Sequence, residues 1–134
     1  MAVLLAVVVL ATVGLDVATA GAAPPPAPVP AASCSYTLTS PSKVDVSGTD
    51  MVTATLTHGP CTGEITPNSM TVCIELRGYT PPQCNFHPTF DPVQVFFTPY
   101  RSGGTYLATG RGCGNVFPMA DESCSSLGPY TKTL

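Results

Sequence analysis

Two histidines are the side chains in this sequence most suited to proton transfer, because the ordinary pKa of histidine lies closest to neutral pH. His58 lies in THGPC and His87 lies in FHPTF, each beside turn-forming residues. No GxSxG motif marks a serine nucleophile. SPSK at 40–43 matches an SxxK motif by letters alone, because Pro41 opposes the helix that this motif needs. We assign no catalytic residue; a small secreted hydrolase, or a hydrolase inhibitor, that uses His58 or His87 is the alternative function.

Carboxylates could also form a catalytic pair. After residue 33 they are Asp45, Asp50, Glu64, Glu75, Asp91, Asp121 and Glu122. Their neighbours indicate ordinary solvated positions. Glu75 falls on the same strand face as Arg77, which favours a local ion pair.

Six cysteines follow residue 33, namely Cys34, Cys61, Cys73, Cys84, Cys113 and Cys124. An even number in a small exported chain is typical of a disulfide framework. The simplest pairing joins neighbours: Cys34–Cys61, Cys73–Cys84 and Cys113–Cys124. The first of these bridges would set Val52 opposite Lys43, a poor apolar pair, so it would have to tie strand ends together. A Cys61–Cys113 bridge, nearer the immunoglobulin pattern, is the alternative.

Metal and phosphate binding are the other chemistries that short motifs suggest. CNFH at 84–87 has a ligand-like gap, but no second pair has matching spacing, so we expect no metal. GRGCG has the spacing of neither phosphate-loop motif, and no amphipathic helix pattern follows it, so we expect no cofactor. We interpret the stretch that includes GRGCG as a strand that begins after a turn at Gly103–Gly104 and ends at Cys113. Glycine removes the steric limits where the strand bends out of the sheet.

The candidate side chains described above must lie on β-strands or on the turns between them, because apolar and polar residues alternate with a period of two after residue 33. Turn-rich clusters such as HGP, TPNS and RSGG separate them. The pattern predicts an all-β fold, an immunoglobulin-like antiparallel β-sandwich of about seven short strands stapled by disulfides. Tyr106 is expected to tie the start of a strand to the preceding loop. The expected strands are 35–39, 43–46, 51–57, 69–77, 83–86, 92–97, 105–110 and 129–134.

The first residues have the features of an export signal. Residues 2–15 carry no charge and are too few to span a bilayer, and small residues follow them, so 1–23 is predicted to be a signal peptide. The Pro/Ala-rich segment 24–33 is expected to be an extended spacer, and 34–134 the β-sandwich domain. The protein is then secreted or held in the cell envelope, and touches a membrane only through the signal peptide before cleavage.

Charge excludes one class of partner. The formal net charge is −3 and only 10% of residues are charged, so the sequence has no basic stripe along which a nucleic-acid backbone could bind. We expect no nucleic-acid partner.

Whole phrases of the chain resemble a group of known proteins. MVTATLT, PCTGEITPNSMTVCIEL, QVFFTPYRSGGTY and LGPYTKTL are similar to small exported proteins of mycobacteria and related actinobacteria. The resemblance covers most of the chain after Cys34. It implies an exported protein with paired cysteines, and it carries over no activity and no functional residue.

These observations favour an exported, non-catalytic interaction module whose partner is an envelope protein or a glycan. In PVQVFFTPYR, Val93, Val95 and Phe97 alternate inward, so Phe96 should point outward. Phe96 is then either covered, for which Phe117 is the candidate, or open to a partner. In the open case it forms an interaction patch with Tyr100 and Arg101 in the next turn.

Overall fold

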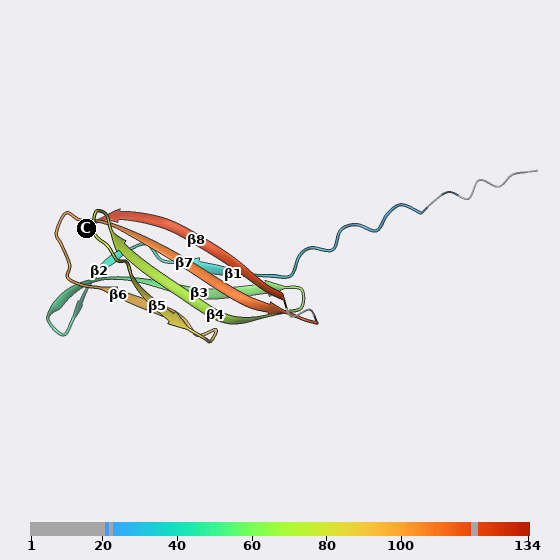
Figure 1. Cartoon of the computed structure of the whole chain (residues 1–134), viewed down its shortest axis with the longest axis horizontal. Helices are drawn as coiled ribbons and strands as arrows, with labels where there is room; N and C mark the ends of the chain where they lie inside the picture. Colours follow the sequence, from blue (N-terminus) through green and yellow to red (C-terminus); the bar gives the residue numbers. More distant parts are fainter. Residues whose placement is uncertain (1–20, 22, 119–120) are drawn as a thin grey trace, which may run out of the picture.

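The computed structural model of the 134-residue chain describes residue 21 and residues 23–118 and 121–134. The expected signal peptide therefore lies almost entirely outside the described residues. Residues 23–32 have no regular secondary structure, are almost all exposed, and run away from the folded part (Figure 1). The described residues include no helix with the length and apolar character needed to cross a bilayer.

The folded part consists of strands that form two antiparallel sheets. In the first sheet β3 is central: β1 and β2 follow one another along one of its edges, and β6 pairs with the other. The second sheet has the order β5-β4-β7-β8 (Figure 1). The strands are β1 (Ser33–Leu38), β2 (Ser42–Val46), β3 (Thr49–Thr62), β4 (Ile65–Leu76), β5 (Gln83–His87), β6 (Val93–Phe97), β7 (Thr105–Val116) and β8 (Asp121–Thr133).

One core lies between the two sheets. Alternate residues of β3, β4 and β6 point into it, which confirms the period-two prediction for these strands. Tyr106 contributes the largest fully buried side chain, and its ring meets Phe97 edge-on at 5.6 Å between centroids. The core residues with the least exposure are Val52, Leu56, Val72, Ile74, Val93, Tyr106 and Ala108.

Several strands are longer than their local sequence predicts. HGP lies inside β3 and TPNS inside β4, so the turns expected there are wrong. The ladder explains this, because Ile65 to Pro67 pair with Gly114 to Val116 of β7, and backbone pairing outweighs local turn preference. Eight strands form, each overlapping one of the eight expected segments, and Pro41 separates β1 from β2. Beside this break, the Thr39 hydroxyl accepts a hydrogen bond from the Thr55 N–H at 2.8 Å.

The glycine-rich stretch is also part of a strand. β7 continues to Val116, so the predicted exit at Cys113 is wrong. Gly110, Gly112 and Gly114 are buried and alternate inward. A Cβ on Gly112 would overlap the Tyr36 ring, and a Cβ on Gly110 would lie 2.9 Å from Leu56 Cδ1. Glycine is needed here because the first sheet approaches closely.

All six cysteines pair as neighbours, as predicted, and the described residues contain no free cysteine. Each bridge joins residues that face each other on adjacent strands, with Cα–Cα distances of 3.9 to 4.0 Å. Cys34–Cys61 ties the end of the β1–β3 ladder, and Val52 lies opposite Lys43 as expected. The Cys61–Cys113 alternative is wrong. Three disulfides indicate an extracellular or otherwise oxidising environment.

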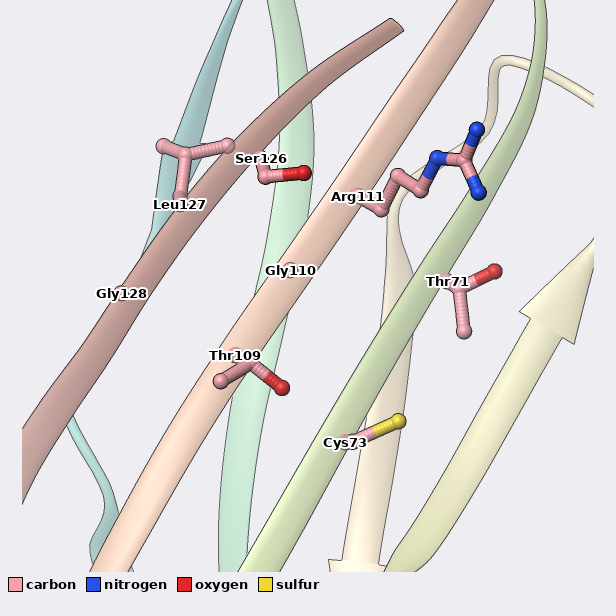
Figure 2. Close-up of a pocket in the computed structure, with 8 residues that line it drawn as sticks. All are labelled: Thr71, Cys73, Thr109, Gly110, Arg111, Ser126, Leu127 and Gly128. Carbon is pink, nitrogen blue, oxygen red and sulfur yellow. The ribbon is translucent and has the colours of Figure 1, made fainter.

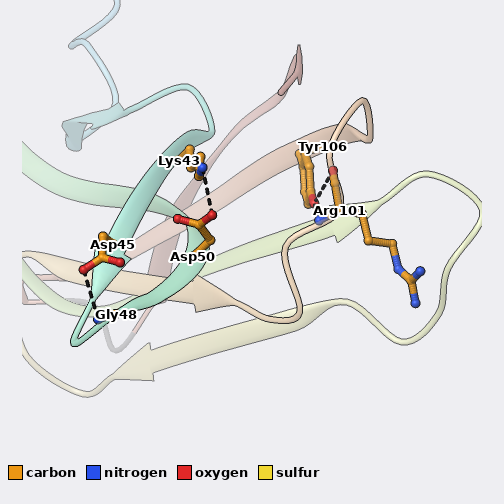
Figure 3. A network of polar contacts seen from close by, with 6 residues as sticks. All are labelled: Lys43, Asp45, Gly48, Asp50, Arg101 and Tyr106. Carbon is orange, nitrogen blue, oxygen red and sulfur yellow. Dashed lines mark hydrogen bonds and ion pairs between the residues drawn. The ribbon is translucent and has the colours of Figure 1, made fainter.

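Tyr106 fixes the loop between β6 and β7. Its hydroxyl accepts a hydrogen bond from the Arg101 N–H at 2.7 Å and donates one to the Arg101 carbonyl at 3.2 Å (Figure 3). This confirms the predicted link between the start of a strand and the preceding loop.

Candidate interaction surface

The two histidines lie apart from the four main pockets that the described residues form. His58, in β3, has its Nδ1 at 3.2 Å from the Gly59 carbonyl, and its ring meets Phe90 edge-on at 5.8 Å. His87 ends β5, opposite Met70 of β4. Neither histidine lines any of these four pockets. No histidine base is therefore directed into one of them, where a substrate could sit.

One group of side chains has ligand-like spacing. The donor atoms of Cys113, Glu122 and Cys124 lie within 4.8 Å of one another. Both sulfurs belong to one disulfide, however, so neither is a thiolate, the form that binds metals. The same holds for Cys84 of the CNFH motif, which is bonded to Cys73.

The three residues of the predicted interaction patch have different surroundings. Phe96 points outward and stays 41% exposed, and Phe117 is itself 74% exposed. Tyr100 packs partly buried against the core, stacked on Tyr106 with 6.4 Å between ring centroids. Arg101 lies over the Tyr79 ring, 4.7 Å from its centroid. Phe96 and Arg101 line two separate pockets.

The Phe96 pocket is a groove of about 440 Å³ between the free edges of β5 and β6. Side-chain amides bridge it. Gln83 donates to the Thr98 carbonyl at 2.6 Å and accepts from the Thr98 N–H at 3.1 Å, and Asn85 donates to the Gln94 carbonyl at 2.8 Å. These side-chain amides make hydrogen bonds that a neighbouring strand would otherwise make. They therefore protect the edges of β5 and β6, because an unpaired strand edge can pair with another chain.

The outer face of the second sheet carries two adjoining hollows, of about 280 and 260 Å³. They share Cys73 and Thr109. Thr71, Arg111 and Ser126 line the first hollow (Figure 2), and Glu75, Leu107 and Pro129 line the second. We call the surface made by these eight residues the outer face.

A bulge in β8 shapes both hollows. The β7–β8 register shifts between Ala108 and Gly110, and Gly128 there has a φ of +86°. Gly128 lines the first hollow, and the following Pro129 lines the second. An extra residue in one strand lifts the local chain and re-aims side chains, which accounts for hollows on an otherwise regular sheet. The Gly-Pro pair inside β8 is the sequence signal for this bulge.

Arg111 supplies the positive charge of the outer face. Its Nη2 lies 3.3 Å from Cys124 Sγ. Arg111 forms no ion pair with a carboxylate among the described residues, where the ion pair is between Lys43 and Asp50 at 2.8 Å. The ion pair expected between Glu75 and Arg77 is therefore absent from these residues. The guanidinium keeps donors available for a ligand.

Four strands contribute one row of side chains across this face. Arg111 of β7 lies opposite Thr71 of β4 and Ser126 of β8, and Thr71 lies opposite Phe86 of β5. Phe86 is 57% exposed. The row thus combines an open aromatic ring, two hydroxyls and an unpaired cation. Such groups recognise a ligand by stacking and hydrogen bonding, and they include no general base. Sequence reasoning did not single out Arg111, since residues 111–128 were not expected to form strands.

No protein-family model, curated protein or solved structure matches the chain.

Proposed function

We propose that the protein is an exported, non-catalytic interaction module of the cell envelope or extracellular space, and that it binds an envelope protein or glycan through the outer face. The row Phe86–Thr71–Arg111–Ser126 carries this proposal; its last three residues belong to the outer face, and Phe86 adjoins them on β5. Aromatic and arginine side chains are enriched at recognition surfaces, and hydroxyls next to them can satisfy polar ligand groups.

The fold is in keeping with a binding role. We infer that the sandwich is immunoglobulin-like: β1 with β2, β3 and β6 would form one sheet of that fold, and β5, β4, β7 and β8 the other. The Tyr106–Arg101 hydrogen bonds correspond to the tyrosine corner of such domains. Two features depart from antibody domains, because the chain has no tryptophan and its bridges lie within sheets rather than between them.

Export rests on sequence and on covalent chemistry together. The predicted signal peptide 1–23, the spacer 24–33 and the three disulfides all suit an oxidising location outside the cytoplasm. The resemblance to exported actinobacterial proteins agrees with this placement. The alternative function, a hydrolase or inhibitor that uses His58 or His87, gains no support from the pockets.

Residue-resolved NMR tests the binding face. Isotope-labelled protein is titrated with purified envelope polysaccharide and, separately, with solubilised envelope proteins. We expect the signals of Thr71, Thr109 and Arg111 to shift on addition of one of these fractions. The signals of Thr55 and Thr57, on the outside of the first sheet, should stay in place. Shifts confined to the first sheet would exclude the outer face as the binding surface.

A further inference from the structure

A separate pocket of about 370 Å³ lies where the loops after β4 and after β6 meet. Its lining includes Gly103, whose N–H donates a hydrogen bond to the carbonyl of Leu134, the residue after β8. The C-terminus lies at the end of the sandwich away from the spacer, so the pocket lies at that end too (Figure 1). Arg77, Tyr79, Arg101, Ser102 and Thr105 provide its side chains. We call it the arginine pocket.

The backbone beneath Arg101 is firmly held. Its N–H and carbonyl both bond the Tyr106 hydroxyl, and its carbonyl also accepts from the Gly104 N–H at 3.1 Å. Gly104 has no space for a side chain, since a Cβ there would lie 2.8 Å from Leu76 Cδ1 and 2.9 Å from the Arg101 carbonyl. The loop that carries Arg101 is therefore preorganised, which lowers the entropic cost of binding.

The Arg101 side chain is held as well. Figure 3 shows it extending from the β6–β7 loop towards the β4–β5 loop, where its guanidinium lies over the Tyr79 ring at 4.7 Å from the centroid. Stacking uses the face of a guanidinium and leaves the N–H donors at its edge free. Only the backbone of Arg77 is fixed by a hydrogen bond here, because its main-chain N–H donates to the Thr105 carbonyl at 2.9 Å.

The pocket carries two positive charges and no negative one in its lining. Neither Arg77 nor Arg101 forms an ion pair with a carboxylate among residues 21, 23–118 and 121–134. The backbone amides of Gly103 and Gly104 are already used, by Leu134 and Arg101. An anion must then be bound by the guanidinium edges and the adjacent Ser102 hydroxyl.

We propose that the arginine pocket binds the phosphate group of a phosphorylated sugar, either free or as the headgroup of a lipid. Two arginines line the pocket and match the charge of a phosphate monoester, and the edge of a guanidinium can donate two parallel hydrogen bonds to its oxygens. The volume exceeds what one phosphate fills, and Tyr79, which is 48% exposed, offers an apolar ring against which a sugar can lie. This proposal does not depend on the outer face, which lies on other residues.

Calorimetric titration of the purified protein tests the pocket with inorganic phosphate, a hexose 6-phosphate and the unphosphorylated hexose. We expect the hexose phosphate to bind most tightly and the neutral hexose not to bind. Arg101→Gln and Arg77→Gln should each weaken hexose phosphate binding by about ten- to a hundredfold. Lys43→Gln is the matched control, because it removes one positive charge at a residue outside the pocket lining and should leave this affinity unchanged. Melting temperatures check that each variant is folded.

Tyr79→Leu separates the two parts of the ligand. It should weaken hexose phosphate binding by a larger factor than inorganic phosphate binding, because it removes the sugar contact as well as the ring that holds the Arg101 guanidinium. Sedimentation with phosphatidylcholine vesicles, with and without phosphatidylinositol, distinguishes a lipid headgroup from a free sugar phosphate. Binding to the vesicles that contain phosphatidylinositol, and its loss in Arg101→Gln, supports the lipid headgroup. Binding of the free sugar phosphate alone supports a soluble ligand. Failure of both phosphate probes and of the vesicles to bind, or equal weakening by Lys43→Gln, overturns the proposal.

Discussion

The Tyr36 ring of β1 packs directly against the backbone of Gly112 in β7, so the two sheets meet there with no second side chain between them. The Tyr36 hydroxyl is buried and has no hydrogen-bond partner among the described residues. Burial raises the pKa of this phenol above its ordinary value. The contact explains why glycine occupies an inward position in the middle of a long strand.

Gly112→Ala should destabilise the protein by about 1–3 kcal/mol, because the new methyl group overlaps the Tyr36 ring and must displace it from its packed position. Urea unfolding measures the change. The control is the same substitution in a Tyr36→Ala background, where the space is free and the added cost should fall below about 1 kcal/mol. An equal cost in both backgrounds would show that the ring is not the obstacle.

Tyr36→Phe and Tyr106→Phe should differ sharply, although each removes one hydroxyl. The Tyr106 hydroxyl makes two hydrogen bonds to Arg101, so its loss should cost about 1–3 kcal/mol. The Tyr36 hydroxyl is unpartnered, so its loss should be neutral or stabilising. Thermal melts of the two variants test the contrast. A Tyr36→Phe protein that melts as low as Tyr106→Phe contradicts it.

Stability should fall in alkaline solution. Desolvation raises the pKa of Tyr36 in the folded protein above its ordinary value of 10.0. The contribution of the neutral phenol to the free energy of unfolding is therefore fully present below pH 10.0 and is lost as the pH rises through the folded-state pKa. The pKa of Lys43 is raised above 10.5, chiefly by its hydrogen bond to Asp50. The contribution of the Lys43 charge to stability is therefore also lost as the pH rises. Melting temperatures between about pH 8 and 11 measure the loss, which should be smaller in Tyr36→Phe. A profile in Tyr36→Phe that follows the wild type would exclude the phenol as a cause.

The three disulfides should contribute unequally. Replacing both cysteines of one bridge with alanine should cost about 2–4 kcal/mol. Cys34–Cys61 spans 27 residues, against 11 for each of the others, which makes its entropic contribution about 0.8 kcal/mol larger. Cys34 and Cys113 are each only 6% exposed, so removal of their bridges also loses packing. The Cys73–Cys84 variant should be the most stable of the three in urea unfolding, and finding it the least stable would contradict this order.

Periodicity and spacing predict much of the framework. Val52, Leu56, Val93 and Val95 are core residues as their alternation requires. The neighbour pairing of cysteines is correct because every bridge joins two facing residues on adjacent strands. Tyr106 also forms its predicted hydrogen bonds.

Long-range pairing decides the features that sequence reasoning missed. Pro67, Gly114 and Pro129 are turn-forming residues by local chemistry, yet each lies within a strand: Pro67 faces Gly114 across the β4–β7 ladder, and Pro129 lies at the bulge of β8. Since the ends of β7 and β8 were not predicted, neither was the outer face that they build. The amides of Gln83 and Asn85 that bridge to β6 had no signal in the sequence, because a polar residue in a short strand normally faces solvent.

The most direct test of the proposed function compares two threonine variants in the capture of envelope components. Thr109→Glu places a charge where the two hollows of the outer face join, and Thr57→Glu places the same charge at an exposed position of β3 in the first sheet. Immobilised wild-type protein and both variants are incubated with envelope protein and glycan fractions, and the retained material is quantified. We expect wild type and Thr57→Glu to retain the same component and Thr109→Glu to lose it. Equal retention by all three proteins, or selective loss in Thr57→Glu, would contradict binding through the outer face.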